Sequence, residues 1–242
     1  MNVLAFNCSP MMDKGNTALI LGPFLEGMKE EGAKVELFYT RKLKINPCRG
    51  ELNCYLKTPG ECFQEDDMQM LYPVLSRADI WVFATPVYWD GVTGPMKDLM
   101  DRLTPLSGPF YEVRNGHCAV QLRPGVKSGK VVLVSTCGQW EMDNFDPTLA
   151  HMKAFSRMAS RVFAGAVLRP HADEMKPMMG RGVSFDDIFQ AAKRAGSQLA
   201  RDGRMSPRTL KVISRELMPR DEYIEAVNRG TRQALAKLSK NR

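Results

Sequence analysis

Short apolar segments alternate with segments of helical periodicity along most of the 242-residue chain, and this alternation constrains the fold more than any other feature. Continuous apolar runs of this length are typical of buried parallel strands. The segments between them place apolar residues at helical spacing, as in Leu21, Phe24, Leu25 and Met28. The predicted strands are NVLAF (2–6), KVELFY (34–39), the start of DIWVFATPVYW (79–89), KVVLVST (130–136) and RVFAGAVL (161–168).

Strands that alternate with helices predict a parallel sheet covered by helices on both faces, and right-handed crossovers leave few topologies. Five strands favour a flavodoxin-like α/β fold, a doubly wound sheet of order 2-1-3-4-5. We expect this domain over residues 1–200 and a helical C-terminal extension over 201–242. Residues 104–129 are rich in glycine and proline and show no clear period, so they predict a long loop or excursion.

Local signals mark the ends of several helices. Gly32 predicts the end of the first helix. Thr93 occupies an N-cap position, and Pro95 follows in the first helical turn, which predicts a helix that continues to Leu103. Further helices are expected over 68–75, over 146–160 and after Ser184.

The net charge of +7 is concentrated in the tail of the chain. From Lys193 onward there are 13 basic and 5 acidic residues, against 21 and 22 before it. Apolar residues are interspersed with these charges, a pattern that favours helical arms with one solvated and one packed face over nucleic-acid binding. We therefore predict a homodimer or homotetramer and no nucleic-acid partner.

The sequence also predicts a soluble, cytoplasmic protein without a membrane partner. MNVLAFNCSP is too short and too polar for the apolar region of a signal peptide, and no apolar run approaches the length of a membrane span. In a reducing cytosol the six cysteines are expected to be unpaired, so a cluster of them indicates metal or redox chemistry before a disulfide framework.

In a sheet of this order, ligands bind beyond the carboxyl ends of the strands, where the first and third strands meet. The first loop there, NCSPMMDKGNTALIL, combines hydroxyl and amide side chains with Gly15 and a helix N-terminus, which is the form of a phosphate cradle. It is neither a Walker A motif nor a dinucleotide fingerprint, and an ordinary helix start remains an alternative.

Two further loops end at the same edge. The second, ATPVYWDGVTGPMKDLMDRL, places Tyr88 and Trp89 where a flat cofactor would lie, although buried aromatic residues in a core or interface are the alternative. The third, STCGQWE, can present backbone amides to the edge of a ring. Cys137 within it has no histidine at a recognizable spacing to activate it, so we do not expect a cysteine nucleophile, and no other catalytic residue is evident.

Three segments together resemble the flavodoxin-like NAD(P)H-dependent FMN reductase family, in particular its branch related to the iron-sulfur flavoproteins. They are SPMMDKGNT (9–17), PCRGELNCYLKTPGECFQEDDM (47–68) and TPVYWDGVTGPMKDLMDRL (85–103), and in order the resemblance covers most of residues 1–170. It implies noncovalently bound FMN, with its phosphate on the first loop and its ring against the other two.

Residue by residue, the resemblance gives the following cofactor-binding set. Family members commonly have an arginine directly after the Ser-Pro, where this chain has Met11, and Lys14 is the candidate to replace that contact. The phosphate would be held by Ser9, Lys14, Gly15, Asn16 and Thr17. The ring would be lined by Pro86, Val87, Tyr88, Trp89, Asp90 and Gly91, with Ser135, Thr136 and Gly138 from the third loop.

The resemblance also bears on the cysteine-rich segment. Iron-sulfur members have four cysteines there, and the second would fall at Glu51 in this chain. Because a [4Fe-4S] cluster normally takes four thiolates, we expect Cys48, Cys54 and Cys62 to hold neither a stable cluster nor zinc. The segment is instead predicted to be a loop that covers the flavin or a neighbouring subunit.

The sequence therefore predicts an oxidoreductase that takes hydride from NAD(P)H through FMN and reduces a flavin, quinone or similar small acceptor. Because the flavin performs the redox chemistry, the protein needs no acid-base pair. One alternative is a flavin-bearing electron-transfer protein, like an iron-sulfur flavoprotein, that serves a protein partner. Another is a binding module on the same fold that has lost FMN.

Overall fold

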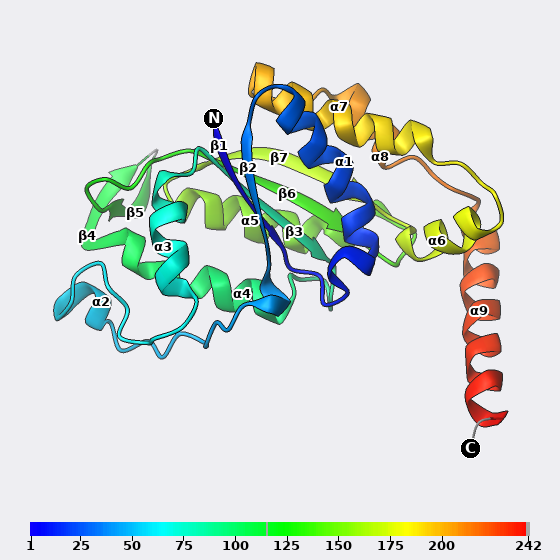
Figure 1. The fold of residues 1–242 in the computed structure, drawn as a ribbon, viewed down its shortest axis with the longest axis horizontal. Coiled ribbons are helices and arrows are strands. Elements are labelled where there is room, and N and C mark those ends of the chain that lie inside the picture. The colour runs from blue at the N-terminus through cyan, green and yellow to red at the C-terminus, as the bar shows by residue number, and fades with distance from the viewer. Residues whose placement is uncertain (115, 241–242) are drawn as a thin grey trace.

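A parallel sheet of five strands forms the centre of the structure, a computed structural model that describes residues 1–114 and 116–240 (Figure 1). The strand order is β2-β1-β3-β6-β7, and every neighbouring pair is parallel. Since β6 and β7 are the fourth and fifth strands of this sheet in chain order, the predicted order 2-1-3-4-5 is confirmed. The strands are β1 (Asn2–Asn7), β2 (Lys34–Tyr39), β3 (Ile80–Pro86), β6 (Lys130–Thr136) and β7 (Val162–Arg169).

Helices cover both faces of the sheet because successive strand residues point to opposite sides. On β1, Val3 and Ala5 join a core with α1 (Asn16–Glu30) and α7 (Asp186–Asp202). Leu4 and Phe6 join a second core on the opposite face. The helices of that second face are α3 (Met68–Arg77), α4 (Gly94–Asp101) and α5 (Asp146–Met158).

Gly32 and Thr93, which the sequence marks as helix ends, have different roles in the structure. Gly32 follows α1 with a φ of 78°, a conformation that suits glycine. Thr93 is the N-cap residue of α4, but its hydroxyl donates to the Cys8 carbonyl at 2.9 Å instead of capping the helix. Thr93 therefore ties the start of α4 to the loop after β1.

The predicted loop over 104–129 contains a hairpin that the sequence analysis missed. β4 (Ser107–Arg114) and β5 (His117–Leu122) pair antiparallel in a separate two-stranded sheet. Phe110, Tyr111 and Val113 are exposed on it, and the pairing register shifts within β4. The apolar alternation that reveals a half-buried strand is therefore absent from this segment.

The C-terminal part is helical, as expected, but its helices differ in their packing. α8 (Pro207–Ile213) lies against α7 and β7, and Ile213 is fully buried in the first core. α9 (Arg220–Lys240) instead projects from the body (Figure 1). The remaining helices are the short α2 (Asn53–Leu56) and α6 (Ala172–Gly180).

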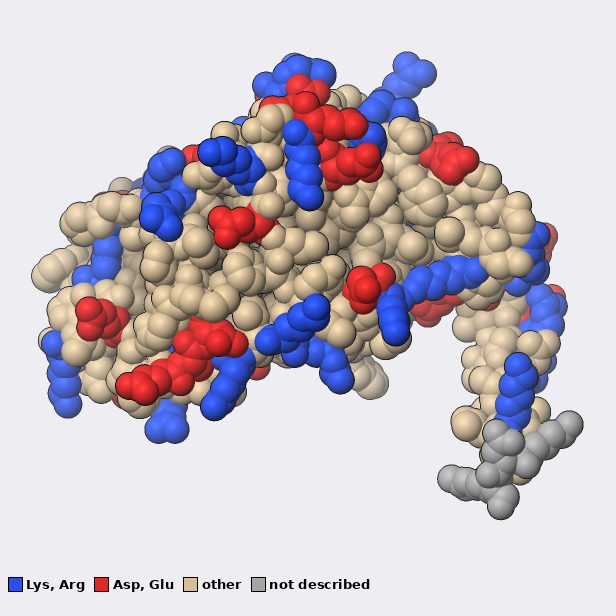
Figure 2. Space-filling model, viewed as in Figure 1, with Lys and Arg blue, Asp and Glu red and all other residues tan. Residues whose placement is uncertain are grey.

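Two surface properties bear on partners. On the face drawn in Figure 2, basic and acidic side chains are interspersed over the body. Within residues 1–114 and 116–240, no helix combines the length and the apolar composition that crossing a bilayer requires.

Candidate functional site

A cleft of about 480 Å³ lies at the carboxyl edge of the sheet, where the loops after β1, β3 and β6 meet. The three loops predicted from the sequence to form one site therefore do come together. The lining residues are Ser9, Met11, Gly15, Asn16, Thr17, Pro86, Val87, Tyr88, Thr136, Cys137, Gly138, Gln139, Ala172 and Asp173.

The loop after β1 is shaped by the buried side chain of Asn7. Its Nδ2 donates to the Met12 carbonyl at 3.2 Å, and its Oδ1 accepts from the backbone N–H of Ser9 at 3.0 Å. The Ser9 hydroxyl in turn accepts from the Met11 N–H at 3.3 Å. An asparagine that hydrogen-bonds the backbone two residues on is a common turn former, so Asn7 could have been identified from sequence.

Gly15 allows the loop to close against the start of α1. A Cβ at this position would lie 2.6 Å from the Ser9 Oγ, which is inside van der Waals contact. α1 begins at Asn16 without a side-chain cap, so its first backbone N–H groups are free to bind a ligand. Free amides at a helix N-terminus favour an anion such as a phosphate.

The loop after β6 is joined to α1 inside the cleft. The hydroxyls of Thr17 and Thr136 form a buried hydrogen bond of 2.9 Å. Gly138 lies close to a carboxylate, because a Cβ there would be 2.5 Å from the Asp173 Oδ2. Glycine is therefore required at both ends of the cleft by close packing.

Asp173, at the start of α6, is the residue that the sequence analysis missed at this site. Its Oδ1 accepts a hydrogen bond from the Asn16 Nδ2 at 3.1 Å, and burial raises the pKa of its carboxyl. It follows β7, whose carboxyl end lies at the same edge as those of the other strands. A search of all the loops at this edge would have included it.

The loop after β3 turns sharply, and its tip points away from the cleft. Tyr88 and Gly91 exchange two backbone hydrogen bonds of 3.0 Å around Trp89 and Asp90, whose φ values are 47° and 58°. Positive φ at both central residues is the type I′ geometry. Tyr88 lines the cleft, whereas Trp89 is fully exposed and neither it, Asp90 nor Gly91 is among the lining residues.

Two other predicted residues also lie outside the lining. Ser135 is buried beneath it, where its hydroxyl donates to the Thr85 carbonyl at 2.8 Å. Lys14 lies in the short turn before α1, and its carbonyl accepts a hydrogen bond from the Lys176 side chain. This contact brings the basic Lys176 side chain to the loop after β1, outside the lining of the cleft.

The loop after β6 is supported from behind by the C-terminal part of the chain. Arg169 is fully buried and donates to the carbonyls of Ile213 and Arg215, each at 2.7 Å, and to the His171 Nδ1 at 3.0 Å. The His171 Nε2 donates to the Trp140 carbonyl at 2.6 Å. Burial, followed by the charge of Arg169, lowers the pKa of His171 to about 4, so the ring is neutral.

α9 also contacts this loop directly. The Tyr223 hydroxyl donates to the Gly138 carbonyl, and the Trp140 Nε1 donates to the Met218 carbonyl at 3.1 Å. The rings of Trp140 and His171 are stacked with centroids 5.2 Å apart. The C-terminal segment therefore fixes the position of a loop that forms one wall of the cleft.

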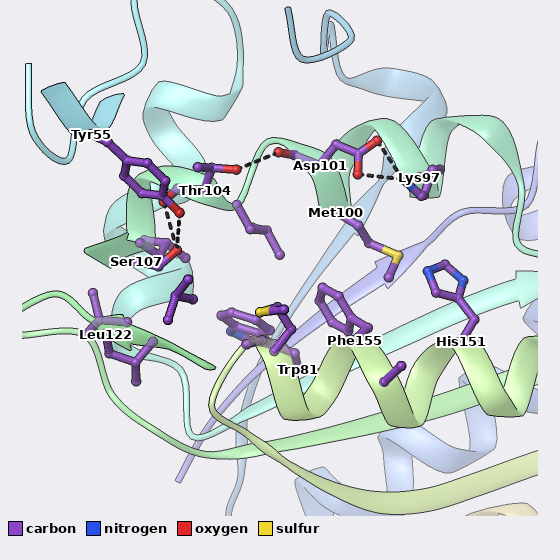
Figure 3. Close-up of a pocket in the computed structure, with 17 residues that line it drawn as sticks. Tyr55, Trp81, Lys97, Met100, Asp101, Thr104, Ser107, Leu122, His151 and Phe155 are labelled. Carbon is purple, nitrogen blue, oxygen red and sulfur yellow. Dashed lines mark hydrogen bonds and ion pairs between the residues drawn. The ribbon is translucent and has the colours of Figure 1, made fainter. Parts of the chain in front are cut away.

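A second hollow, of about 420 Å³, lies on the face covered by α4 and α5 (Figure 3). Trp81, Met100 and Phe155 project into it. At its rim, Lys97 is paired with Asp101 at 2.6 Å, and burial lowers the pKa of His151. This hollow, called the apolar pocket below, therefore offers little free charge to a ligand.

Residues 1–171 match the model of the NADPH-dependent FMN reductase family. The chain belongs to this family. Membership confirms the family that the sequence resembles and the FMN cofactor that this resemblance implied.

Curated relatives of this chain are iron-sulfur flavoproteins. One, from Archaeoglobus fulgidus, is 33% identical over 129 residues, which is 53% of this chain and 62% of the relative. Another, from Methanocaldococcus jannaschii, is 35% identical over 115 residues, or 48% of this chain and 58% of the relative. The chain thus spans about three fifths of the length of these two proteins.

Solved structures of other reductases share the fold. An NAD(P)H:quinone oxidoreductase from Methanothermobacter marburgensis has a TM-score of 0.56 at 18% identity, covering 82% of this chain and 96% of its own. An FMN-dependent NADH-azoreductase from Bacillus anthracis has a TM-score of 0.59 at 16% identity, covering 83% and 100%. At these identities the likeness concerns the fold alone.

The cleft fits an FMN molecule in size and in chemistry. Its volume of about 480 Å³ falls within the range usual for small-molecule sites. The free amides of α1 and the small side chains of the first loop suit a phosphate. One feature opposes an anion, namely the Asp173 carboxyl beside Asn16.

The cysteine-rich loop does not fit an iron-sulfur cluster. Arg102, with 1% of its surface exposed, donates to both oxygens of Asp66 at 2.6 and 3.1 Å, and its Nη2 lies 3.4 Å from the Cys62 Sγ. A small hollow of about 30 Å³ is lined by Cys48, Cys54 and Cys62 together with Glu51, Arg102 and other residues. Among the described residues, no group of three His, Cys, Asp or Glu side chains is arranged to hold a metal ion.

Arg102 instead supplies a positive charge that holds the cysteine-rich loop in place. Burial of Asp66 disfavours its charge, but hydrogen bonds from Arg102 and from the backbone of Asn46 and Met68 outweigh burial and hold the pKa of its carboxyl below the usual value. Arg102 also donates to the Asn46 carbonyl at 2.8 Å. A buried ion pair between Arg102 and Asp66 thus holds the cysteine-rich segment together, while the buried Arg102 Nε has no hydrogen-bond partner among the described residues.

Proposed function

We propose that this protein transfers a hydride from NAD(P)H, through FMN held in the cleft, to a small planar acceptor such as a quinone or a free flavin. The net reaction is NAD(P)H, a proton and a quinone giving NAD(P)⁺ and a hydroquinone, so two electrons and two hydrogens are accounted for. The observation on which the proposal depends is the cleft at the carboxyl edge, with free helix amides beside Gly15 and Ser9.

Bound FMN would supply the redox chemistry, and the protein would supply position and electrostatics. Ser9, Asn16 and Thr17 would hold the phosphate together with the N–H groups of α1. Pro86, Val87 and Tyr88 would flank the ring on one side, and Thr136 and Gly138 on the other. Among the residues that line the cleft, none forms an acid-base pair of the kind that hydrolytic chemistry requires.

The exposure of the loop after β3 favours a small acceptor. Tyr88 is half exposed at the mouth of the cleft, and Trp89 is fully exposed beside it. Two aromatic rings at an open entrance suit planar molecules, which can stack on them. A nicotinamide ring and a quinone could therefore reach the same position in turn.

The test is a pair of alanine variants whose added Cβ atoms meet different surroundings. Gly15→Ala, at the N-cap of α1, brings a Cβ to 2.6 Å from the Ser9 Oγ, whereas the Cβ of Gly22→Ala, inside α1, meets nothing within 4 Å. Both are titrated with FMN, followed by absorbance from 300 to 700 nm, and then mixed with NADPH or NADH without oxygen. We expect Gly15→Ala to weaken FMN binding by about a hundredfold, equivalent to about 2.7 kcal/mol, and Gly22→Ala to match the wild type.

The possible outcomes separate the functional classes. Flavin bands that bleach on addition of NADPH or NADH support the reductase. Bound flavin with negligible NAD(P)H oxidation would favour an electron carrier that serves a protein partner. A colourless protein that ignores added FMN would contradict both and leave a binding module on the same fold.

A further inference from the structure

The outer part of α9 has no contact that explains its helical structure. Tyr223 and Ala226 are buried at its base, where the helix lies against α6, but every side chain from Asn228 to Ser239 is exposed. In Figure 1 this part projects from the body. Isolated helices shorter than about 12 to 15 residues are marginal in water, so this segment needs a partner surface to remain helical.

One face of α9 has the apolar spacing of a coiled-coil helix. Alternating steps of three and four residues are the heptad pattern of a and d positions. Ile224 and Leu238, at the two ends, have 48% and 65% of their surfaces exposed, and Leu235 beside them has 61%. The positions on this face, called the α9 stripe below, are Ile224, Val227, Thr231, Ala234 and Leu238.

The charges of α9 specify the direction of the partner helix. Arg220 begins the helix, three acidic residues follow it in the first turns, and the next charged residues are basic: Asp221, Glu222 and Glu225, then Arg229, Arg232 and Lys237. A parallel copy of this helix would place like charges side by side. An antiparallel copy places the acidic turns against the basic turns, which is favourable.

A groove at the base of α9 can receive the free end of an antiparallel copy. It measures about 240 Å³ and lies between α9 and the loop after β6. Trp140, Ile224 and Val227 line it together with Gly138, whose carbonyl accepts the Tyr223 hydroxyl. The groove is continuous with the α9 stripe because both contain Ile224 and Val227.

We propose that α9 pairs antiparallel with α9 of a second copy of this chain, about a two-fold axis near the middle of the helix. The partner's Leu235 and the partner's Leu238 then occupy the groove beside Trp140. Because the loop after β6 forms a wall of the cleft, each cleft is supported by the second copy. The proposal concerns assembly and does not depend on the cofactor or the acceptor.

The first test measures the mass in solution by light scattering. The wild type is expected at twice the chain mass of 27.2 kDa or at a higher even multiple. The double variant Leu235→Glu/Leu238→Glu changes only exposed side chains and is expected to lower that mass at least twofold at the same concentration. A wild type at the monomer mass, or an assembly whose mass the double variant leaves unchanged, would overturn the proposal.

The second test determines direction through cysteine substitutions. Near a two-fold axis, Thr231→Cys lies close to its own copy and is expected to form a disulfide-linked dimer on mild oxidation. Leu238→Cys, at the far end, lies opposite the partner's base and is expected to form none. The wild type, with its six native thiols, is the control. A linked dimer from Leu238→Cys would indicate a parallel pair and overturn the antiparallel assignment.

Discussion

The cleft and the apolar pocket have similar volumes, about 480 and 420 Å³, but are built from different parts of the fold. The cleft is formed by backbone, glycines and hydroxyls at the ends of strands. The apolar pocket is formed by large side chains on α4, α5 and the β4–β5 hairpin (Figure 3). Size therefore does not identify the candidate active site here, whereas the position of free amides at the carboxyl edge does.

The largest expected effect concerns α4, which forms a wall of the apolar pocket and ends beside Arg102. Arg102→Ala leaves the buried Asp66 carboxylate without its partner, and we expect a loss of about 3 to 5 kcal/mol in the free energy of unfolding. Lys97→Ala removes an exposed ion pair with Asp101 on the same helix and is expected to cost about 0.5 kcal/mol or less. Urea denaturation measures both, and equal losses would show that burial of the pair is not the cause.

A smaller effect is expected from the charge of Asp173 in the cleft. Its raised pKa means that the carboxyl takes up a proton earlier than usual as the pH falls. Ionised Asp173 repels an FMN phosphate, so Asp173→Asn should bind FMN about three- to tenfold more tightly at pH 8, or about 1 kcal/mol.

The pH dependence of FMN binding separates the effect of the Asp173 charge from other effects of the substitution. The phosphate titrates equally in both proteins, so the ratio of their FMN affinities reports Asp173 alone. The ratio is expected to move towards one as the pH falls, because the wild-type carboxyl takes up a proton. Fluorescence titration of FMN at pH 5, 6, 7 and 8 measures the ratio. A ratio that does not change with pH would assign the effect to lost hydrogen bonding with Asn16.

The smallest expected effect tests whether the two hollows are independent. Ala154→Trp adds a large ring at the exposed edge of the apolar pocket, and we expect FMN affinity and NAD(P)H oxidation to stay within about twofold of the wild type. Gly15→Ala, which blocks the cleft, is the matched comparison. If Ala154→Trp lost NAD(P)H oxidation while FMN stayed bound, the apolar pocket would be shown to take part in acceptor binding.

The sequence predicted the central fold well because its signals are local. Each strand is a continuous apolar run, and each main helix has its own apolar spacing, so five strands and their order could be derived. The hairpin over Ser107–Leu122 was missed because its strands are exposed and show no apolar alternation. Strand pairing between exposed segments is decided by contacts that the pattern does not record.

The site was predicted in part for the same reason. Ser9, Gly15 and Thr17 were placed by the rule that ligands bind beyond the carboxyl ends of the strands, and the structure brings them to one cleft. Trp89 was expected at the ring but lies on a tight turn that points to solvent. The direction of a side chain in a turn depends on backbone angles that residue types only restrict.

The sequence by itself determined the sheet, its order, the family and the edge at which the cleft lies, because periodicity and strand ends are properties of the chain. Only the tertiary structure decided which side chains reach the cleft, since Asp173 and the supporting network of Arg169, His171 and Tyr223 come from segments distant in sequence. It also placed Arg102 against Asp66 and Cys62. Contacts between distant segments are fixed by packing, which no local pattern specifies.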